Sequence, residues 1–176
     1  MKKVAVFGGP GAGKSTLSKK LAALTQLPLH ALDKLCYGAG GAVVPGEVYA
    51  RRHEEILAQP AWLMEGYGSY ESVWQRLAEA DTLVYLDLPL RLHLWWVTKR
   101  FIKGVFVPPE GWPDDSPLLR GTLSSYRHVW LCHKHLTPEY RAFVVQEAGS
   151  KQVFHLRSPA DIARFLGNVA SGLPGP

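Results

Sequence analysis

The stretch VAVFGGPGAGKST, which runs from Val4 to Thr16, decides the fold of this chain. It begins as a run of apolar residues that stops at two glycines, a pattern typical of a buried strand in a parallel sheet. The residues from Gly8 to Ser15 then follow the spacing Gly-x-x-x-x-Gly-Lys-Ser of a phosphate-binding loop. Such a loop requires a helix behind it, and the leucine spacing over Lys14 to Thr25 predicts that helix.

Each residue type of this loop has a chemical role in phosphate binding. Glycine tolerates positive φ, so the backbone can curl tightly and turn its N–H groups toward phosphate oxygens at the positive end of the helix. The Lys14 ammonium is expected to bridge the β- and γ-phosphates of a nucleotide, and the Ser15 hydroxyl is expected to bind Mg²⁺. The alternative is a glycine turn that binds no ligand. The residues expected to bind the nucleotide are Gly8, Gly9, Gly11, Ala12, Gly13, Lys14, Ser15 and Thr16.

Strands and helices are predicted to alternate along the rest of the chain. A parallel sheet with helices on both faces follows from that alternation, because βαβ crossovers are right-handed. We therefore expect one α/β domain over residues 1–176, a three-layer sandwich whose five-stranded parallel sheet binds ligands beyond the carboxyl ends of its strands. A Pro/Gly/Asp-rich break at 104–117 falls within a helical lid or insert expected around 100–135. The predicted strands are 3–7, 28–32, 61–66, 81–89 and 151–156, and the predicted helices are 14–25, 47–58, 70–80, 90–103, 118–131, 138–148 and 159–169.

The composition excludes several classes of protein. The chain has 176 residues, of which 47% are hydrophobic and 20% charged, so it is globular rather than disordered. Its formal net charge of +5 fits polyanionic ligands, either nucleotides or nucleic acid. Its two cysteines lie far apart and form no disulfide framework, and no apolar run is long enough for a membrane span or a signal peptide. We expect a cytoplasmic protein with no membrane partner.

Three further segments resemble one group of kinases. They are LPLHALDKLCY at 27–37, AWLMEGYGSYESVWQRLAEADTLVYLDLP at 61–89 and RLHLWWVTKRFIKG at 91–104. Together with the glycine loop, they resemble P-loop kinases related to adenylate kinase, and within that group the bacterial DNA topology modulation (FlaR-like) proteins. The resemblance covers residues 1–103 well and the rest loosely. It implies the P-loop NTPase fold, ATP and Mg²⁺ as cofactors, and transfer of the γ-phosphate to a small-molecule, nucleoside or nucleotide acceptor.

The resemblance also implies roles for residues outside the loop. Glu65 ends the third predicted strand, where the relatives carry an aspartate that holds Mg²⁺ through water or acts as a base toward the acceptor. Asp33 follows the second strand, where an acid contacts the acceptor and is a candidate general base. Arg100 lies where these kinases place lid arginines that clamp phosphates. The alternatives are a helix-facing or solvated acid for Glu65, an N-cap or loop acid for Asp33 and a solvated basic helix face for Arg100. Asp87 is interpreted as a structural capping residue.

The acceptor is left open by the sequence. The stretch EGYGSY lacks the arginine with which adenylate kinase grips the phosphate of its acceptor, so a hydroxyl-bearing small molecule is at least as consistent as a monophosphate. Arg51, Arg52 and Arg76 are the residues that could substitute for that arginine. Most of the six tryptophans are interpreted as packing residues, and Trp112, in the Pro-rich break, is the best candidate for a ligand contact.

Two other functions stay open at this point. A nucleotide-dependent regulator that touches DNA is supported by net basicity alone, because no nucleic-acid-binding motif is readable. A plain NTPase would need a residue that activates water, and none is marked by the sequence.

Overall fold

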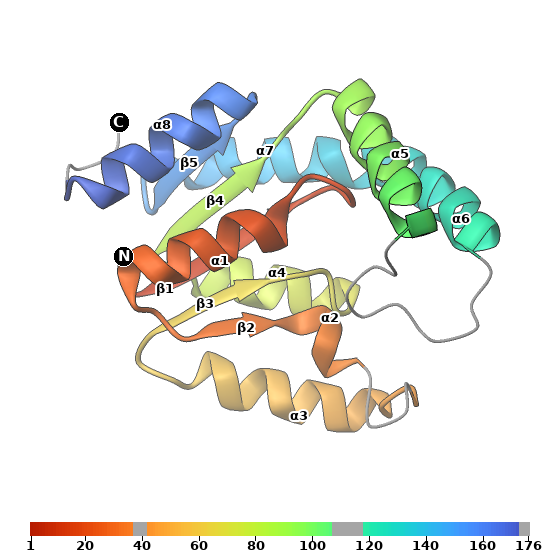
Figure 1. Cartoon of the computed structure of the whole chain (residues 1–176). Coiled ribbons are helices and arrows are strands. Elements are labelled where there is room, and N and C mark those ends of the chain that lie inside the picture. The colour runs from red at the N-terminus through yellow and green to blue at the C-terminus, as the bar shows by residue number, and fades with distance from the viewer. Residues whose placement is uncertain (37–41, 107–117, 173–176) are drawn as a thin grey trace.

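The chain forms an α/β fold around a five-stranded parallel sheet with the strand order β2-β3-β1-β4-β5. The computed structural model describes residues 1–36, 42–106 and 118–172, with helices on both faces of the sheet (Figure 1). The α/β class and the five parallel strands predicted from the sequence are thereby confirmed. The strands are β1 (Lys3–Gly8), β2 (Leu29–Ala31), β3 (Trp62–Glu65), β4 (Thr82–Leu86) and β5 (Gln152–Leu156).

The helices follow the predicted ranges closely and differ in three places. The helix that begins at Leu90 continues to Phe106, so the predicted break is wrong for residues 104–106, while 107–117 lie outside the described residues. A single glycine at 104 costs a helix only about 1 kcal/mol, which does not end it. The short α2 and the π-helical turn η2, which joins α6 to α7, were not predicted. The helices are α1 (Lys14–Thr25), α2 (Leu32–Leu35), α3 (Gly46–Leu57), α4 (Tyr70–Glu79), α5 (Leu90–Phe106), α6 (Leu118–Leu131), η2 (Cys132–Leu136), α7 (Thr137–Glu147) and α8 (Pro159–Ala170).

Two hydrophobic cores fill the space between the sheet and its helices. Side chains of a strand point alternately to opposite faces, so Val4 and Val6 pack in one core and Ala5 and Phe7 in the other. The first core is closed by α1 and α8, and the second by α3, α4 and α7 (Figure 1). Burial on both faces explains why β1 is a continuous apolar run rather than an alternating one.

The sheet brings several chain segments to one edge. β1 pairs in parallel with β3 on one side and β4 on the other, with Val6 opposite Glu65 and Gly8 opposite Leu86. The carboxyl ends of these strands therefore meet, and the glycine loop that leaves β1 lies beside the end of β3. A site at this edge is what an open parallel sheet provides where neighbouring crossovers run to opposite faces.

Asp87 follows β4 at that edge and has a structural role. Its side chain is only 6% exposed and accepts hydrogen bonds from Arg141 Nε at 2.8 Å, Arg141 Nη2 at 2.9 Å and His155 Nε2 at 2.8 Å. Burial by itself would raise the pKa of the Asp87 carboxyl, but the hydrogen bonds from Arg141 and His155 hold it below its ordinary value. Asp87 thus ties α7 to β5. It accepts from side chains rather than capping a helix, which corrects the predicted capping role.

The burial of His53 predicts that the stability of the fold depends on pH. The residue is 1% exposed on α3, stacks on Tyr49 with ring centroids 6.0 Å apart, and has no partner for Nε2 in the described part of the chain. Burial and the charge of Arg76 lower its pKa from the ordinary 6.5 to about 4. The unfolded chain therefore takes up this proton first. The contribution of neutral His53 is complete above about pH 6.5 and is lost as the pH falls toward 4, by about 3 kcal/mol.

Denaturant unfolding at a series of pH values measures this effect. A plot of the unfolding free energy against pH has a slope between pH 6.5 and 4 to which His53 contributes. His53→Phe should remove that contribution, because phenylalanine keeps an aromatic ring in the core but has no titrating group. The exposed His135 on η2 offers a control, and His135→Asn should keep the wild-type slope. An unchanged slope in His53→Phe would show that His53 is not the source.

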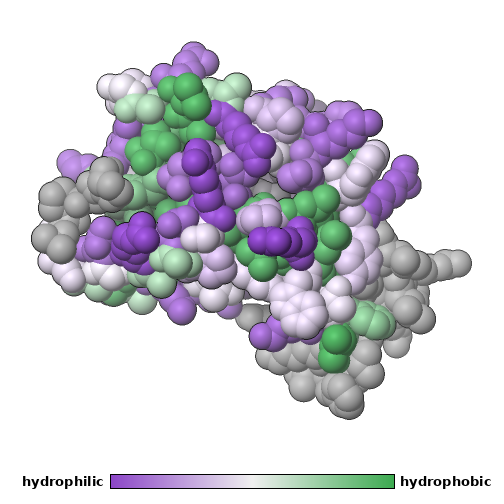
Figure 2. All heavy atoms as spheres, turned by 90° about the horizontal axis from the view of Figure 1, so that it is seen from above, coloured by the Kyte–Doolittle hydropathy of each residue, from purple (hydrophilic) through white to green (hydrophobic). Residues whose placement is uncertain are grey.

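The surface carries hydrophobic side chains in separate patches among hydrophilic ones on the face seen in Figure 2. The exposed large hydrophobic residues include Trp95, Ile102 and Trp130, all on the helix pair α5 and α6. Within the described ranges, no helix combines the length and the apolar character that crossing a membrane requires.

Candidate functional site

The glycine loop turns sharply from β1 into α1. Gly8, Gly11 and Gly13 have φ values of +142°, +72° and +81°, a region that residues with a Cβ rarely adopt. α1 begins after Gly13, and in the described structure no side chain caps its first turn. The N–H groups at this helix end therefore lack the acceptor that a capping side chain would supply, which favours an anion at that position.

The glycines also make room for α5. A Cβ at Gly9 would lie 3.0 Å from the ring of His93, closer than side chains normally pack. His93 is buried, with Nδ1 2.8 Å from the carbonyl oxygen of Pro10 and Nε2 3.1 Å from that of Leu88. The imidazole therefore joins the loop to the start of α5. Cβ atoms at Gly11 and Gly13 would each lie 3.2 Å from an α5 side chain, Val97 and Trp96 respectively.

Lys14 places its ammonium over the loop. Its Nζ donates to the carbonyl oxygens of Gly8 at 3.1 Å and Gly9 at 3.0 Å. Burial lowers the pKa of Lys14, and the negative charges of Asp33 and Glu65 oppose that shift. The ammonium is thus held at the point where the sequence predicts phosphate oxygens, with two carboxylates near enough to affect its titration.

Ser15 and Glu65 bring two oxygen atoms together from different elements. Ser15 lies in the first turn of α1 and Glu65 ends β3, and Ser15 Oγ donates to Glu65 Oε2 at 3.1 Å. Burial raises the pKa of Glu65, while the hydrogen bond from Ser15 and the charge of Lys14 act in the opposite direction. A hydroxyl and a carboxylate so placed fit Mg²⁺, which binds oxygen, takes few ligands from the protein and keeps several waters.

Asp33 lies in α2 and holds the loop that follows β3. Its Oδ1 accepts hydrogen bonds from the backbone N–H groups of Tyr67 at 2.9 Å and Gly68 at 3.4 Å. Gly66 has φ of +107°, and a Cβ there would lie 3.0 Å from Asp33 Oδ1. One carboxylate oxygen of Asp33 is thus engaged by backbone. Its role as a general base stays a prediction.

The arginines considered for an acceptor phosphate lie in different surroundings. Arg76, on α4, is fully buried and donates from Nη1 to the carbonyl oxygen of Tyr67 at 3.2 Å and from Nη2 to that of Gly66 at 2.5 Å. Its guanidinium is thus used inside the protein. Arg51 and Arg52 are exposed on α3. Arg76 therefore does not take the place of the missing acceptor arginine in this arrangement.

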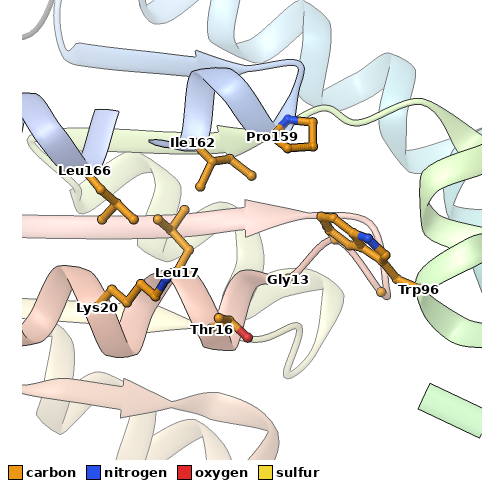
Figure 3. Close-up of a pocket in the computed structure, with 10 residues that line it drawn as sticks. Gly13, Thr16, Leu17, Lys20, Trp96, Pro159, Ile162 and Leu166 are labelled. Atoms are coloured by element: carbon orange, nitrogen blue, oxygen red, sulfur yellow. The ribbon is translucent and has the colours of Figure 1, made fainter. Parts of the chain in front are cut away.

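A largely apolar pocket of about 380 Å³ adjoins the glycine loop. One wall comes from α1 and the other from α8, while Trp96 reaches in from α5 beside Gly13 (Figure 3). Pro159, the first residue of α8, also lines the pocket. The lining residues are Gly11, Ala12, Gly13, Thr16, Leu17, Lys20, Trp96, Pro159, Ile162 and Leu166.

The predicted roles of Arg100 and Trp112 are not tested by the described contacts. The backbone of Arg100 belongs to α5, but its side chain lies outside the described part of the structure, so its role as a lid arginine stays a prediction. Trp112 lies outside the described residues altogether. Sequence reasoning did not single out Trp96 or His93. The only signal for Trp96 was its place in the aromatic and basic helix before the lid, and a lone histidine in an apolar helix gave none.

No protein-family model matches this chain, and the search among curated proteins found no match either. The kinase resemblance of the sequence therefore stays a prediction. The proposed function therefore rests on the contacts of the glycine loop, β3 and the pocket.

Proposed function

We propose that this protein is a P-loop kinase, with the P-loop NTPase fold, that transfers the γ-phosphoryl group of ATP to a small hydroxyl-bearing acceptor. The observation that carries the proposal is the convergence of Lys14 Nζ over the glycine loop with the Ser15–Glu65 pair at the end of β3. A glycine turn without a ligand gives no reason for a lysine, a hydroxyl and a carboxylate to meet at an uncapped helix N-terminus.

The residues of the loop would bind and polarise the phosphates. The N–H groups of the loop and of the first turn of α1 donate to the β- and γ-phosphate oxygens. Lys14 leaves the carbonyl oxygens of Gly8 and Gly9 for the phosphates and neutralises the charge that grows during transfer. Mg²⁺, when bound, would supply a further positive charge that stabilises the phosphates. Ser15 and Glu65 would hold that ion, Glu65 through water, while Thr16 contacts the α-phosphate.

The acceptor side is negatively charged. Glu65 and Asp33 both lie near Lys14 at the carboxyl edge of the sheet, while Arg76 is turned into the interior. Two carboxylates disfavour a phosphate monoester and favour a hydroxyl, whose proton Asp33 or Glu65 accepts as it attacks. Arg100 and the lid would clamp the phosphates and exclude water from the reaction.

The apolar pocket would receive the nucleobase. It adjoins Gly13 and Thr16, so a base lying there leaves the phosphates within reach of the loop. Trp96 offers an aromatic face on which the base can stack. Recognition by stacking and apolar walls would discriminate weakly between adenine and guanine, so GTP is expected to compete with ATP.

Trp96→Ala is expected to weaken ATP binding about tenfold, because stacking on an aromatic side chain contributes about 1–3 kcal/mol per base. Titration of the protein with ATP and with inorganic triphosphate by calorimetry measures the effect. The affinity for triphosphate should change little, because it has no base.

Trp95→Ala is the matched control for this prediction. Trp95 is the neighbouring tryptophan, 58% exposed, and does not line the pocket. Its replacement should leave both affinities as they are in the wild type. Equal ATP affinity in Trp96→Ala and Trp95→Ala would place the base elsewhere.

The proposal as a whole is tested by ATP turnover with Mg²⁺ across nucleosides, nucleoside monophosphates and small hydroxylated metabolites. One acceptor should raise ADP release many-fold over water, and mass spectrometry should find the acceptor phosphorylated. Equal ADP release with every acceptor would point to an NTPase instead. Tight ATP binding without any turnover would point to a nucleotide-dependent regulator.

A further inference from the structure

Arg76 is a buried cation beneath the candidate site. It is 0% exposed on α4, and its Nε has no hydrogen-bond partner in the described structure. No carboxylate of the described residues forms an ion pair with it. A buried charge in this state is costly, whereas an apolar side chain of similar volume would not be. Its neighbour Leu77 is an ordinary residue of the core, equally buried.

Within the described residues, the side-chain hydrogen bonds of Arg76 go to one short segment. Its guanidinium donates to the carbonyl oxygens of Gly66 and Tyr67, the two residues that directly follow Glu65. Two parallel donors of a planar guanidinium fix the orientation of both peptide groups, which a single donor would not do.

Asp33 holds the same segment from the other side. Its Oδ1 accepts from the N–H groups of Tyr67 and Gly68. Residues 66–68 are therefore held through their carbonyl groups by Arg76 and through their N–H groups by Asp33. The segment also contains two glycines at positive φ, Gly66 at +107° and Gly68 at +69°, so the turn is sharp and its shape depends on these contacts.

Both carboxylates of the candidate site depend on this segment. Glu65 is bonded covalently to it, and the place of its side chain relative to Ser15 follows from where the strand turns. Asp33 is hydrogen-bonded to it, so a shift of residues 66–68 would move that carboxylate as well.

We propose that Arg76 is a positioning residue that fixes residues 66–68 and thereby sets the places of Glu65 and Asp33 in the phosphoryl-transfer site. The catalytic consequence rests on the proposed function, whereas the fixing of the segment does not. Arg76 touches neither nucleotide nor acceptor in this role.

The test compares Arg76→Met, Arg76→Lys and Leu77→Ala. Met keeps the bulk and removes both donors, and Lys keeps the charge and some donation. Leu77→Ala lowers stability by removing core packing and changes no hydrogen-bonding side chain. One readout is amide hydrogen exchange in the free protein, comparing the N–H groups of Tyr67 and Gly68 with those of β1. The other is kcat and KM for ATP in the turnover assay.

For Arg76→Met we expect exchange at Tyr67 and Gly68 to rise about tenfold relative to β1, and kcat to fall about 10²-fold with KM for ATP nearly unchanged. In Arg76→Lys, the rise in exchange and the fall in kcat should both be smaller. Leu77→Ala should lower the unfolding midpoint while leaving the relative exchange and kcat at wild-type values.

The inference is overturned if Arg76→Met keeps the wild-type relative exchange and the wild-type kcat, whatever its stability. Should Arg76→Met fail to fold, Arg76→Lys decides, because wild-type exchange and kcat in that variant would equally overturn the inference. If the wild type transfers no phosphate to any acceptor, the kinase proposal fails, and the exchange rates still show whether Arg76 fixes the segment.

Discussion

Replacing Lys14 with alanine is expected to lower acceptor-dependent ATP turnover by about 10²–10³-fold, the usual effect of removing one preorganised donor from a developing charge. Lys14 Nζ lies over the carbonyl oxygens of Gly8 and Gly9, and burial lowers its pKa. An ammonium so placed is poorly solvated, so it interacts strongly with phosphate oxygens. Steady-state ADP release with the best acceptor measures the effect.

Lys19→Ala is the matched control for this experiment, since Lys19 lies on the same helix and is exposed. It should retain turnover within about twofold of the wild type, as surface substitutions usually do. Thermal unfolding of both variants separates a loss of chemistry from a loss of fold. Turnover by Lys14→Ala equal to that of Lys19→Ala would remove the glycine loop from the mechanism.

Gly68→Ala is expected to lower the free energy of unfolding by about 3 kcal/mol. A Cβ at this position would lie 1.8 Å from Tyr49 Oη and 2.8 Å from Tyr49 Cζ, and the residue has φ of +69°. Tyr49 is buried, and its Oη is hydrogen-bonded to Ser72 Oγ at 2.9 Å, so the side chain has little room to move. Both the clash and the backbone strain therefore act against the folded state. Urea unfolding followed by circular dichroism measures the change.

Two further variants separate the clash from the strain. Adding Tyr49→Phe to Gly68→Ala removes the hydroxyl that clashes, so the double variant should recover part of the loss, while the backbone strain and the 2.8 Å contact with the ring carbon remain. Gly46→Ala is the control, because nothing lies within 4 Å of a Cβ there and its φ is not positive. It should change stability by less than about 1 kcal/mol. A Gly68→Ala protein as stable as Gly46→Ala would contradict the packing of the segment described above.

Much of the fold could be predicted because its signals are local. The α1 helix has the bounds that leucine spacing predicts. Four of the five strands lie within one residue of their predicted ranges, and β4 ends three residues before the predicted limit at 89. The end of α5 was misplaced because a Gly/Pro-rich stretch was interpreted as one break from 104 onward. The π-helical turn η2 was not predicted because Pro138 suggests that a new helix begins after a break. In the structure, η2 leads directly into α7, and Pro138 lies in the first turn of α7, where proline is tolerated.

In the candidate site, too, the residues in local motifs could be placed from the sequence. Lys14 and Ser15 are adjacent and sit in a motif of fixed spacing, so the sequence by itself determined that they share a helix N-terminus beside a strand. It also placed Glu65 at the end of a strand, and a parallel sheet brings such ends to one edge. The roles proposed for these residues in phosphoryl transfer stay predictions.

Only the tertiary structure decided which other side chains surround the loop. Trp96 and His93 reach it because α5 packs against glycines some eighty residues away along the chain, as the contacts of Gly9 and Gly13 show. Arg76, one of the three arginines that the sequence offered in place of the missing acceptor arginine, proves to be buried, since α4 closes one of the two cores. Periodicity along a chain shows which face of an element is apolar, but the neighbours of a polar side chain on that face come from other elements. Their distances follow from packing, which no local pattern encodes.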